Sequence, residues 1–331
     1  MKNEFAIELG TSETKIFLKG SGLVLKEPSI IAFNDGSVVA LGKEAKKLIG
    51  KTSKDVEFIH PFAEGVVKDE VAGVALLKNF ISKIIVHGIF PARMKAVFSV
   101  PCGMKSDERV LIEKVAYKSG IDEVLFAPTV ICSKASFGLD LKLNEAVLVC
   151  DIGGGKTDIA IVSKHTILSG VTLGVGGNDM DIALCNFIEK TYGLKISLEA
   201  CEKLKIECGS LFTNDKSNME VCGIDVETKS PRSEVLFASD VRCAVIDFYK
   251  DLIKKIELVI ASASEAVMGD LLKNGILLTG GASEILGLDA LLKNELGIPV
   301  TKASDAENCS ILGAGQLLSD EKMLYLINKD N

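Results

Sequence analysis

Apolar stretches alternate with amphipathic ones along most of this chain. The short apolar run at residues 95–100 predicts a buried strand. Residues 106–118 predict a helix, since acidic side chains open the segment and a lysine and a glycine close it. Between residues 240 and 268 apolar side chains recur at three- or four-residue steps, which predicts one long helix. Strands and helices that alternate in this way indicate an α/β fold.

The most polar segment, residues 213–231, interrupts this pattern and predicts a surface hairpin within a small subdomain. The chain has 331 residues, which is more than one domain usually contains, so we expect two lobes. Hydrophobic residues make up 47% of the sequence and Trp is absent, which leaves aliphatic packing to form the core.

Two segments of the chain share one pattern. Residues 6–17 and residues 149–160 each run from an apolar strand through an acidic residue and a glycine-containing turn to a threonine and a second strand. Such turns expose several backbone N–H groups, and glycine lets the main chain approach an anion without a Cβ in the way. Because Glu8 and Asp151 hold matching places, we expect two related halves that bind one polyphosphate from both sides.

A third glycine turn follows an apolar run later in the chain. Residues 275–279 predict a buried strand, Gly280 and Gly281 predict a turn, and a helix is expected to begin near Ser283 or Glu284. A single turn of this kind is usually structural. Three of them in this order favour a nucleotide site.

The three turns resemble the two phosphate loops and the adenosine loop of the superfamily that contains actin, sugar kinases and heat-shock ATPases. Further segments narrow the resemblance to the bacterial actin family MreB, and it covers nearly the whole chain. These segments are residues 26–32, 39–46, 60–67, 177–181 and 202–207. The resemblance implies an actin-like ATPase fold of two lobes, with duplicated βββαβα units and four subdomains.

The resemblance also implies where the four subdomains lie. Two inner subdomains, IA and IIA, would each contain one βββαβα unit, and two smaller ones, IB and IIB, would lie outside them. The expected limits are residues 1–32, 73–138 and 311–331 for IA, 33–72 for IB, 139–180 and 241–310 for IIA, and 181–240 for IIB.

By the same resemblance, ATP or ADP would bind with Mg²⁺ between the lobes. Glu8 and Asp151 would hold Mg²⁺ mostly through water, because oxygen ligands suit this hard cation. Glu202 and Lys205 would contact the ribose and base, although a solvated ion pair within one helix explains their spacing equally well. The other expected nucleotide ligands are Gly10, Thr11, Ser12, Gly153, Gly154, Gly155 and Lys156 at the phosphates, and Gly280, Gly281 and Ala282 at the adenosine.

Three residues depart from the family pattern. The family's Glu-Pro segment has a Glu that orients the attacking water, and here that residue is Ala127. A threonine of the second phosphate loop contacts the same water in the family, and here it is Lys156. The first loop opens with Asp in the family and with Glu8 here. Since one positioned group contributes about 10²–10⁴ in rate, we expect impaired catalysis and only weak conversion of ATP to ADP and phosphate.

Lys156 allows three interpretations. It could stabilise charge that develops in the transition state, as an arginine finger does. It could bind ground-state ATP equally well and add nothing to turnover. It could also point to solvent and do neither. We favour ground-state binding, because no nearby group in the sequence would position the nucleophile.

Residues 86–95 connect a predicted helix to the strand that follows, and in the family this connection carries a hydrophobic loop that enters the membrane. Ile89 and Phe90, with Arg93 and Lys95 nearby, suit shallow insertion with basic residues at the lipid headgroups. Ordinary packing between helix and strand explains them nearly as well. We favour the membrane because of the resemblance alone.

Charge and cysteine content narrow the function classes. The net charge is −7, whereas a general nucleic-acid binder needs a basic surface, so no nucleic-acid partner is expected. Nine cysteines without a C-x-x-C spacing lie mostly in apolar runs, Cys185 among them, which argues against a disulfide framework or a zinc site and favours the cytosol. Neither a membrane span nor a signal sequence is expected.

These observations predict an ATP-binding protein that polymerises at the inner face of the cytoplasmic membrane and supports cell shape, or motility in a wall-less cell. Its partners would be copies of itself, the membrane surface and other chains of the same family. The main alternative is a monomeric ATPase switch of the heat-shock or reactivase type, which residues 176–181 also match. A sugar or acetate kinase fits less well, since His60, His87 and His165 are expected to be structural or exposed.

Overall fold

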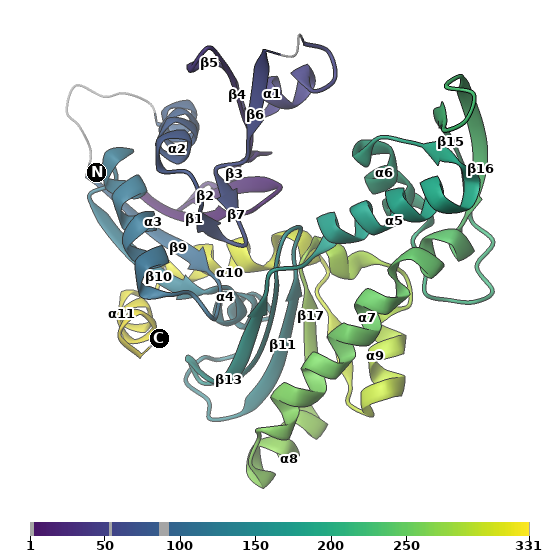
Figure 1. The fold of residues 1–331 in the computed structure, drawn as a ribbon. Helices are drawn as coiled ribbons and strands as arrows, with labels where there is room; N and C mark the ends of the chain where they lie inside the picture. The colour runs from purple at the N-terminus through teal and green to yellow at the C-terminus, as the bar shows by residue number, and fades with distance from the viewer. Residues whose placement is uncertain (1–2, 53–54, 86–92, 331) are drawn as a thin grey trace.

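Within the described residues, which are 3–52, 55–85 and 93–330, the computed structural model contains two five-stranded sheets at its centre. A three-stranded sheet with one or two helices extends from each of them, so that the molecule has four parts (Figure 1). The first central sheet has the order β10-β9-β1-β2-β3 and is made of β1 (Asn3–Leu9), β2 (Glu13–Leu18), β3 (Gly22–Pro28), β9 (Met94–Val100) and β10 (Glu123–Pro128). The strand predicted at residues 95–100 is confirmed as β9.

The second central sheet repeats the topology of the first. It has the order β13-β12-β11-β17-β18 and is made of β11 (Ala146–Ile152), β12 (Thr157–Ser163), β13 (Thr166–Leu173), β17 (Ile276–Thr279) and β18 (Val300–Lys302). In both sheets the first strand pairs antiparallel with the second and parallel with a strand that returns after intervening helices. This shared order confirms the duplicated βββαβα units.

Helices connect the strands and cover the sheets. In the first half, α2 (Glu70–Ile84) leads into β9 and α3 (Ser106–Lys118) leads into β10. The side chain of Asp69 caps α2 by accepting a hydrogen bond of 2.9 Å from the N–H of Ala72. The helix predicted at residues 106–118 is confirmed as α3. The remaining helices of this half are α4 (Thr129–Ser136), α10 (Cys309–Leu317) and α11 (Glu321–Asp330).

The two outer parts are small sheets, one with a single helix and one with two. One consists of β4 (Ile31–Asn34), β5 (Ser37–Leu41), β6 (Val56–Ile59) and α1 (Lys43–Leu48), and the hairpin of β7 (Phe62–Ala63) and β8 (Val66–Val67) follows it. The other consists of α5 (Gly177–Tyr192), β14 (Leu194–Lys195), α6 (Leu198–Cys208), β15 (Asn218–Asp225) and β16 (Pro231–Phe237). The hairpin predicted at residues 213–231 is present as β15 and β16, although it extends further along the chain. The residue limits of the four subdomains stay predictions.

The helix expected over residues 240–268 is wrong at its end. The structure has α7 (Ala238–Ala261), a short break, and then α8 (Glu265–Asn274). The hydroxyl of Ser262 donates to the carbonyl oxygen of Val259 at 2.7 Å, and the Ser264 side chain caps α8. Serine side chains that bond to the backbone in this way compete with helix hydrogen bonds, which explains the break.

The helix expected near Ser283 or Glu284 is also wrong. Only a short 3₁₀ turn, η1 (Gly281–Glu284), follows β17. The hydroxyl of Ser283 donates to the carbonyl oxygen of Gly280 at 2.6 Å, which holds the chain in this tight turn. The α-helix of this region, α9 (Leu288–Leu296), begins only after Gly287.

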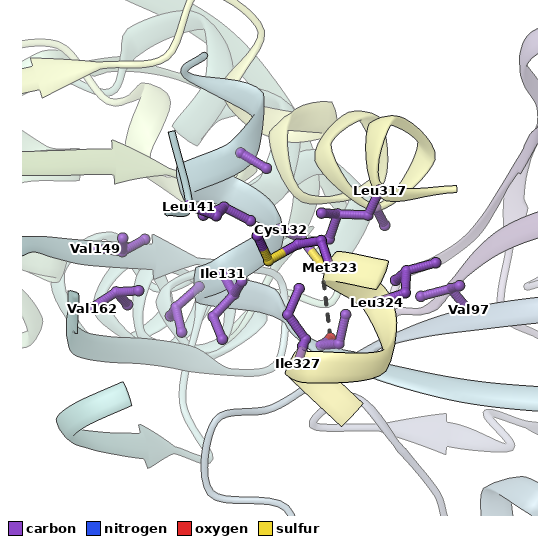
Figure 2. Packing of buried hydrophobic residues seen from close by; sticks show 14 of the residues in the cluster. Val97, Ile131, Cys132, Leu141, Val149, Val162, Leu317, Met323, Leu324 and Ile327 are labelled. Carbon is purple, nitrogen blue, oxygen red and sulfur yellow. Dashed lines mark hydrogen bonds between the residues drawn. The ribbon is translucent and has the colours of Figure 1, made fainter. Parts of the chain in front are cut away.

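One core cluster lies where the two halves of the molecule meet (Figure 2). Val97 comes from the first sheet and Val149 and Val162 from the second, while helices α4, α10 and α11 fill the space between them. The helical members labelled in Figure 2 are Ile131, Cys132, Leu317, Met323, Leu324 and Ile327. This shared core fixes the start of α4 at the junction of the two sheets, close to the candidate site.

The expectation for the cysteines needs one correction. Cys185 of α5 and Cys201 of α6 form a disulfide, with their Cα atoms 5.9 Å apart. Cys185 is half-buried, unlike Cys132 and Cys150, which are buried as expected. The pairing depends on how α5 packs on α6, and spacing along the sequence does not reveal that packing.

Candidate functional site

The two matching turns occupy equivalent places in the two sheets and contact each other. A Cβ added to Gly154 would lie 2.4 Å from Ser12 Oγ, and one added to Gly155 would lie 2.4 Å from Thr11 Oγ1. No side chain fits at either glycine without moving the opposite loop. The structure therefore brings the predicted phosphate ligands of both loops together, from Gly10 to Ser12 and from Gly153 to Gly155.

The first turn of α5 connects these two loops. The N–H groups of Gly177 and Asn178 donate to the carbonyl oxygens of Gly153 and Gly154, at 2.9 and 2.7 Å. From the first loop, the Ser12 hydroxyl donates to Oδ1 of Asn178 at 3.1 Å. A helix N-terminus favours negative charge, so α5 begins at the point where a phosphate group would be stabilised.

The predicted adenosine ligands meet at the same end of α5. Lys205 Nζ donates to the carbonyl oxygen of Gly177 at 2.7 Å. A Cβ on Gly177 would lie 3.2 Å from the Cβ of Ala282, so the adenosine loop borders the same place. Gly280, with a φ of 86°, has no room for a Cβ, which would lie 2.3 Å from the carbonyl oxygen of Ile152. Gly281 follows it in the η1 turn.

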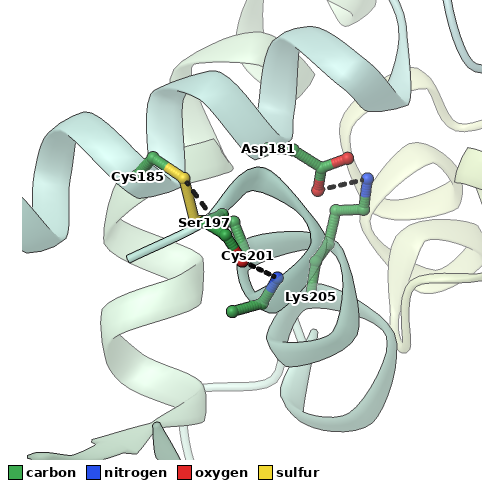
Figure 3. The surroundings of a disulfide bond; sticks show 6 residues. Asp181, Cys185, Ser197, Cys201 and Lys205 are labelled. Carbon is green, nitrogen blue, oxygen red and sulfur yellow. Dashed lines mark hydrogen bonds and ion pairs between the residues drawn. A yellow bond between two sulfur atoms is a disulfide. The ribbon is translucent and has the colours of Figure 1, made fainter. Parts of the chain in front are cut away.

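Lys205 pairs with a different acid from the one considered in the sequence. Its ammonium group forms an ion pair of 2.7 Å with Asp181 of α5 (Figure 3), and its side chain is largely buried. A solvated ion pair with Glu202 therefore does not describe it. Burial raises the pKa of Asp181 to about 6; the Lys205 ammonium opposes this rise, and the half-buried Glu202 carboxylate adds to it. Glu202 thus lies close to the same group of charges.

The two acidic residues expected to hold Mg²⁺ are the next-to-last residues of β1 and β11, just before the two phosphate loops. Asp151 is buried, and its Oδ2 accepts a hydrogen bond of 2.7 Å from the hydroxyl of Thr279. Among the described residues, the buried Oε2 of Glu8 accepts no hydrogen bond, although Lys15 lies 3.7 Å away. Burial raises the pKa of Asp151, and the Glu8 carboxylate contributes to that rise, so the two acids share one environment. Two acids with a free oxygen acceptor fit a hard cation that keeps most of its waters.

Lys156 lies inside the site and does not point to solvent. Only 9% of the residue is exposed, and its ammonium group pairs with Asp158, which is fully buried. It also donates to Oγ1 of Thr129, the first residue of α4, at 3.1 Å. Burial by itself lowers the pKa of Lys156, but the carboxylates of Asp158 and Asp151 outweigh burial and raise it. The lysine therefore stays charged and joins the second loop to the first half of the molecule.

Asp158 in turn connects Lys156 to the segment after β9. Its Oδ1 accepts hydrogen bonds from the N–H of Cys102, at 3.2 Å, and from the hydroxyl of Thr172. Thr172 Oγ1 also accepts a bond of 3.0 Å from the N–H of Gly103. Polar contacts thus run from β12 and β13 to the loop after β9, which ties the two sheets together beneath the phosphate loops.

Ala127, which replaces the water-orienting glutamate of the family pattern, lies in apolar surroundings. It is fully buried at the end of β10, where it pairs with Ser99 of β9, and its methyl group belongs to the core cluster of Figure 2. Ser99 Oγ donates to Thr129 Oγ1 at 3.3 Å, so the residue beside Ala127 reaches the hydroxyl that Lys156 binds. The structure thus places both altered positions near Thr129.

Sequence reasoning missed several partners of the predicted residues. Asn178, Asp158, Thr129, Asp181 and Thr279 each bond to a residue that the sequence had singled out. One of them had a visible signal: Lys156 directly precedes β12 and Asp158 is the second residue of that strand, and side chains two positions apart in an extended chain leave the same face. The others depend on packing between elements that are distant in sequence.

Ile89 and Phe90 lie outside the described residues. Across the ranges 3–52, 55–85 and 93–330, none of the helices combines the length and the apolar character that crossing a bilayer requires. In the same ranges, no group of three or more histidine, cysteine and acidic side chains is arranged to hold a metal ion.

Comparison with known proteins identifies relatives of this chain. It matches the family model of the MreB/Mbl protein over residues 2–325. The cell shape-determining protein Mbl of Bacillus subtilis (strain 168) is 30% identical over 320 residues, which cover 96% of this chain and 96% of that protein. The crystal structure of MreB5 of Spiroplasma citri bound to AMPPNP superimposes with a TM-score of 0.92, at 27% identity and with 98% of both chains covered. The MamK double helical filament shares the fold, with a TM-score of 0.81, 21% identity, and coverage of 97% of this chain and 99% of that one.

Proposed function

The chain belongs to the MreB/Mbl family of actin-like cytoskeletal proteins, and we propose that it binds ATP with Mg²⁺ and assembles with further copies of itself into filaments. The observation that carries the proposal is the contact between the two phosphate loops, Gly10 to Ser12 and Gly153 to Gly155, at the start of α5. Support also comes from the relatives, since MreB5 of Spiroplasma citri was crystallised with the ATP analogue AMPPNP and MamK forms a double helical filament.

Each group of residues has a part in this proposal. Backbone N–H and hydroxyl groups of the two loops bind the phosphates, and Lys205 with Ala282 borders the ribose and base. Glu8 and Asp151 hold Mg²⁺ mostly through water, and the ion neutralises phosphate charge when it is bound. Ala127 offers no acceptor that could align a water molecule, so hydrolysis is slow and the filaments persist in the ATP form.

We expect ATP to drive polymerisation, which pelleting and electron microscopy with ATP, ADP and no nucleotide can measure. Gly155→Ala is expected to weaken ATP binding by about tenfold or more, because the new Cβ collides with Thr11 and separates the loops. Gly269→Ala is the matched control: this glycine of α8 has open space around its Cβ position, so binding should not change. Protein that binds ATP but stays monomeric would contradict the filament and favour a heat-shock or reactivase type of switch.

We also propose that the filaments lie at the inner face of the cytoplasmic membrane, bound through Ile89 and Phe90, and serve cell shape, or motility where a wall is absent. Changing both residues to serine is expected to reduce co-sedimentation with anionic liposomes by about tenfold, because shallow insertion depends on apolar side chains. Polymerisation in solution should survive. The matched control replaces Val110 and Tyr117, two exposed apolar residues of α3, with serine. Liposome binding that falls equally in both variants, or in neither, would argue against this anchor.

A further inference from the structure

Helices α5 and α6 are joined at two neighbouring levels (Figure 3). The disulfide between Cys185 and Cys201 forms one level, and the ion pair between Asp181 and Lys205 forms the other. Asp181 lies four residues before Cys185 on α5, and Lys205 lies four residues after Cys201 on α6. Residues four apart lie on the same face of a helix, one turn from each other. The disulfide is therefore one helical turn away from the ion pair.

The ion pair is itself part of the candidate nucleotide site. Lys205 also donates to the carbonyl oxygen of Gly177, and the next residue, Asn178, bonds to both phosphate loops. A change in the distance between α5 and α6 would move Lys205 relative to the start of α5. The covalent state of the two cysteines is thus coupled through one helical turn to the residues around the nucleotide.

We propose that Cys185 and Cys201 form a thiol-exchange site, which reacts with a low-molecular-weight thiol such as glutathione and whose state sets the affinity for ATP. The proposal rests on the ATP binding proposed above and describes the regulation of that site. The cytosol, which the sequence favours for this chain, is a reducing compartment. Disulfides are rare there, and those that form are usually transient and redox-sensing. A single disulfide in a chain with free cysteines such as Cys222 and Cys243 fits that class better than a structural framework.

The exchange proceeds at the more accessible sulfur. Cys201 is fully buried and Cys185 is half-buried, so the thiolate of the small thiol attacks Cys185. The bond between the two cysteines breaks, Cys201 leaves as a thiolate and takes up a proton, and Cys185 is held in a mixed disulfide. A second small thiolate attacks the small-thiol sulfur of that mixed disulfide and releases Cys185, which also takes up a proton. Two small thiols are thereby oxidised to one disulfide while the two cysteines are reduced, and the reverse reaction closes the pair.

Reduction is not expected to unfold this part of the molecule. The buried residues Leu184, Ile188, Leu204 and Val221 pack between α5, α6 and β15 without help from the disulfide. The carbonyl oxygen of Ser197 lies 3.8 Å from Cys185 Sγ and can accept a hydrogen bond from the reduced thiol. Both states therefore keep the fold and differ in how firmly α6 is held against α5.

The oxidised form is expected to bind ATP about tenfold more tightly, because the disulfide fixes Lys205 beside the start of α5 before the nucleotide arrives. Linkage requires the reverse effect of equal size. Saturating ATP should lower the reduction potential of the cysteine pair by about 30 mV, which corresponds to tenfold for a two-electron couple.

The test measures Mg-ATP affinity by calorimetry on the full chain, oxidised with glutathione disulfide or reduced with dithiothreitol. Cys185→Ser with Cys201→Ser should bind ATP like the reduced protein under both conditions. Cys222→Ser with Cys243→Ser, which removes two exposed free cysteines, should keep the full redox dependence. A redox titration of the unmodified chain with and without ATP gives the same coupling without any variant.

Equal ATP affinity in the oxidised and reduced chain would overturn the inference, as would a redox dependence that survives loss of Cys185 and Cys201. Failure of both states to bind ATP would instead refute the proposed function, and the regulation would fall with it. Tighter binding by the oxidised chain together with a potential shift of matching size supports the thiol-exchange site.

Discussion

Lys156→Met is expected to lower the free energy of unfolding by about 3–5 kcal/mol, because it leaves a buried carboxylate without its cation. Asp158 is fully buried, and the ammonium of Lys156 is its charged partner. The hydrogen bonds from Cys102 and Thr172 remain, but they do not neutralise the charge. Because the polar contacts of Asp158 span both sheets, loss of the cation should also weaken the connection between the two halves. Thermal and urea unfolding would measure the effect.

A double-mutant cycle isolates this ion pair from the other roles of Lys156. Lys156→Met combined with Asp158→Asn should recover much of the lost stability, since no unpaired buried charge remains. Lys134→Met is the matched control: that lysine is also buried, but it donates to the carbonyl oxygens of Lys164 and Glu145 and leaves no buried carboxylate behind. It should lose less stability. Equal losses for Lys156→Met and Lys134→Met, or additive effects in the cycle, would mean that the pair is not the source.

The parts of the fold that the sequence predicts well are those decided by their own residues. Strand β9 is an apolar run, and α3 begins with acidic side chains and ends at a lysine, so each carries its own signals. The end of α7 carries no such signal, because apolar residues keep their helical spacing through the break at Ser262 and into α8. Hydrogen bonds from serine side chains to the backbone, and not hydrophobic periodicity, decide that boundary.

The candidate site also has some features that the sequence predicts and others that depend on packing between elements. Glycine turns are visible in the sequence, and the structure brings Gly154 and Gly155 against the opposite loop as expected. Long side chains are less predictable, because their partners come from other elements. Lys205 has an acidic residue on its own helix within reach, yet it pairs with Asp181 because α6 packs on α5. The disulfide between these helices escapes the sequence for the same reason.

Ala127→Glu together with Lys156→Thr is expected to raise ATP turnover by up to about 10²-fold, the lower end of what one positioned group contributes. Both residues lie near Thr129, so a glutamate and a threonine at these positions could contact the same water molecule. Each single change should do less than the pair, because one contact leaves the water free to turn. Phosphate release from assembled protein would measure turnover.

The double change also alters the buried charge around Asp158, and the experiment must control for this. The exchange adds a carboxylate in a fully buried place and removes the cation of Asp158, so some loss of stability is expected. A second variant that also carries Asp158→Asn removes one of the two uncompensated negative charges without supplying any water contact. Turnover that rises in neither variant, while both stay folded and bind ATP, would contradict an orienting role for these two positions.

Lys156→Thr without Ala127→Glu, made in the Asp158→Asn background, separates the two remaining interpretations of the lysine, which are transition-state stabilisation and ground-state binding of ATP. If turnover falls below that of the Asp158→Asn chain, the ammonium stabilises the transition state and our preference for ground-state binding is wrong. If ATP affinity weakens while turnover holds, Lys156 binds ATP equally in the ground and transition states. We expect the second result, because the ammonium is already held by Asp158 and Thr129 and keeps its position as charge develops on the phosphate. Such a lysine fills the place of a water-orienting threonine with a fixed positive charge, which favours a long-lived ATP-bound filament over rapid turnover.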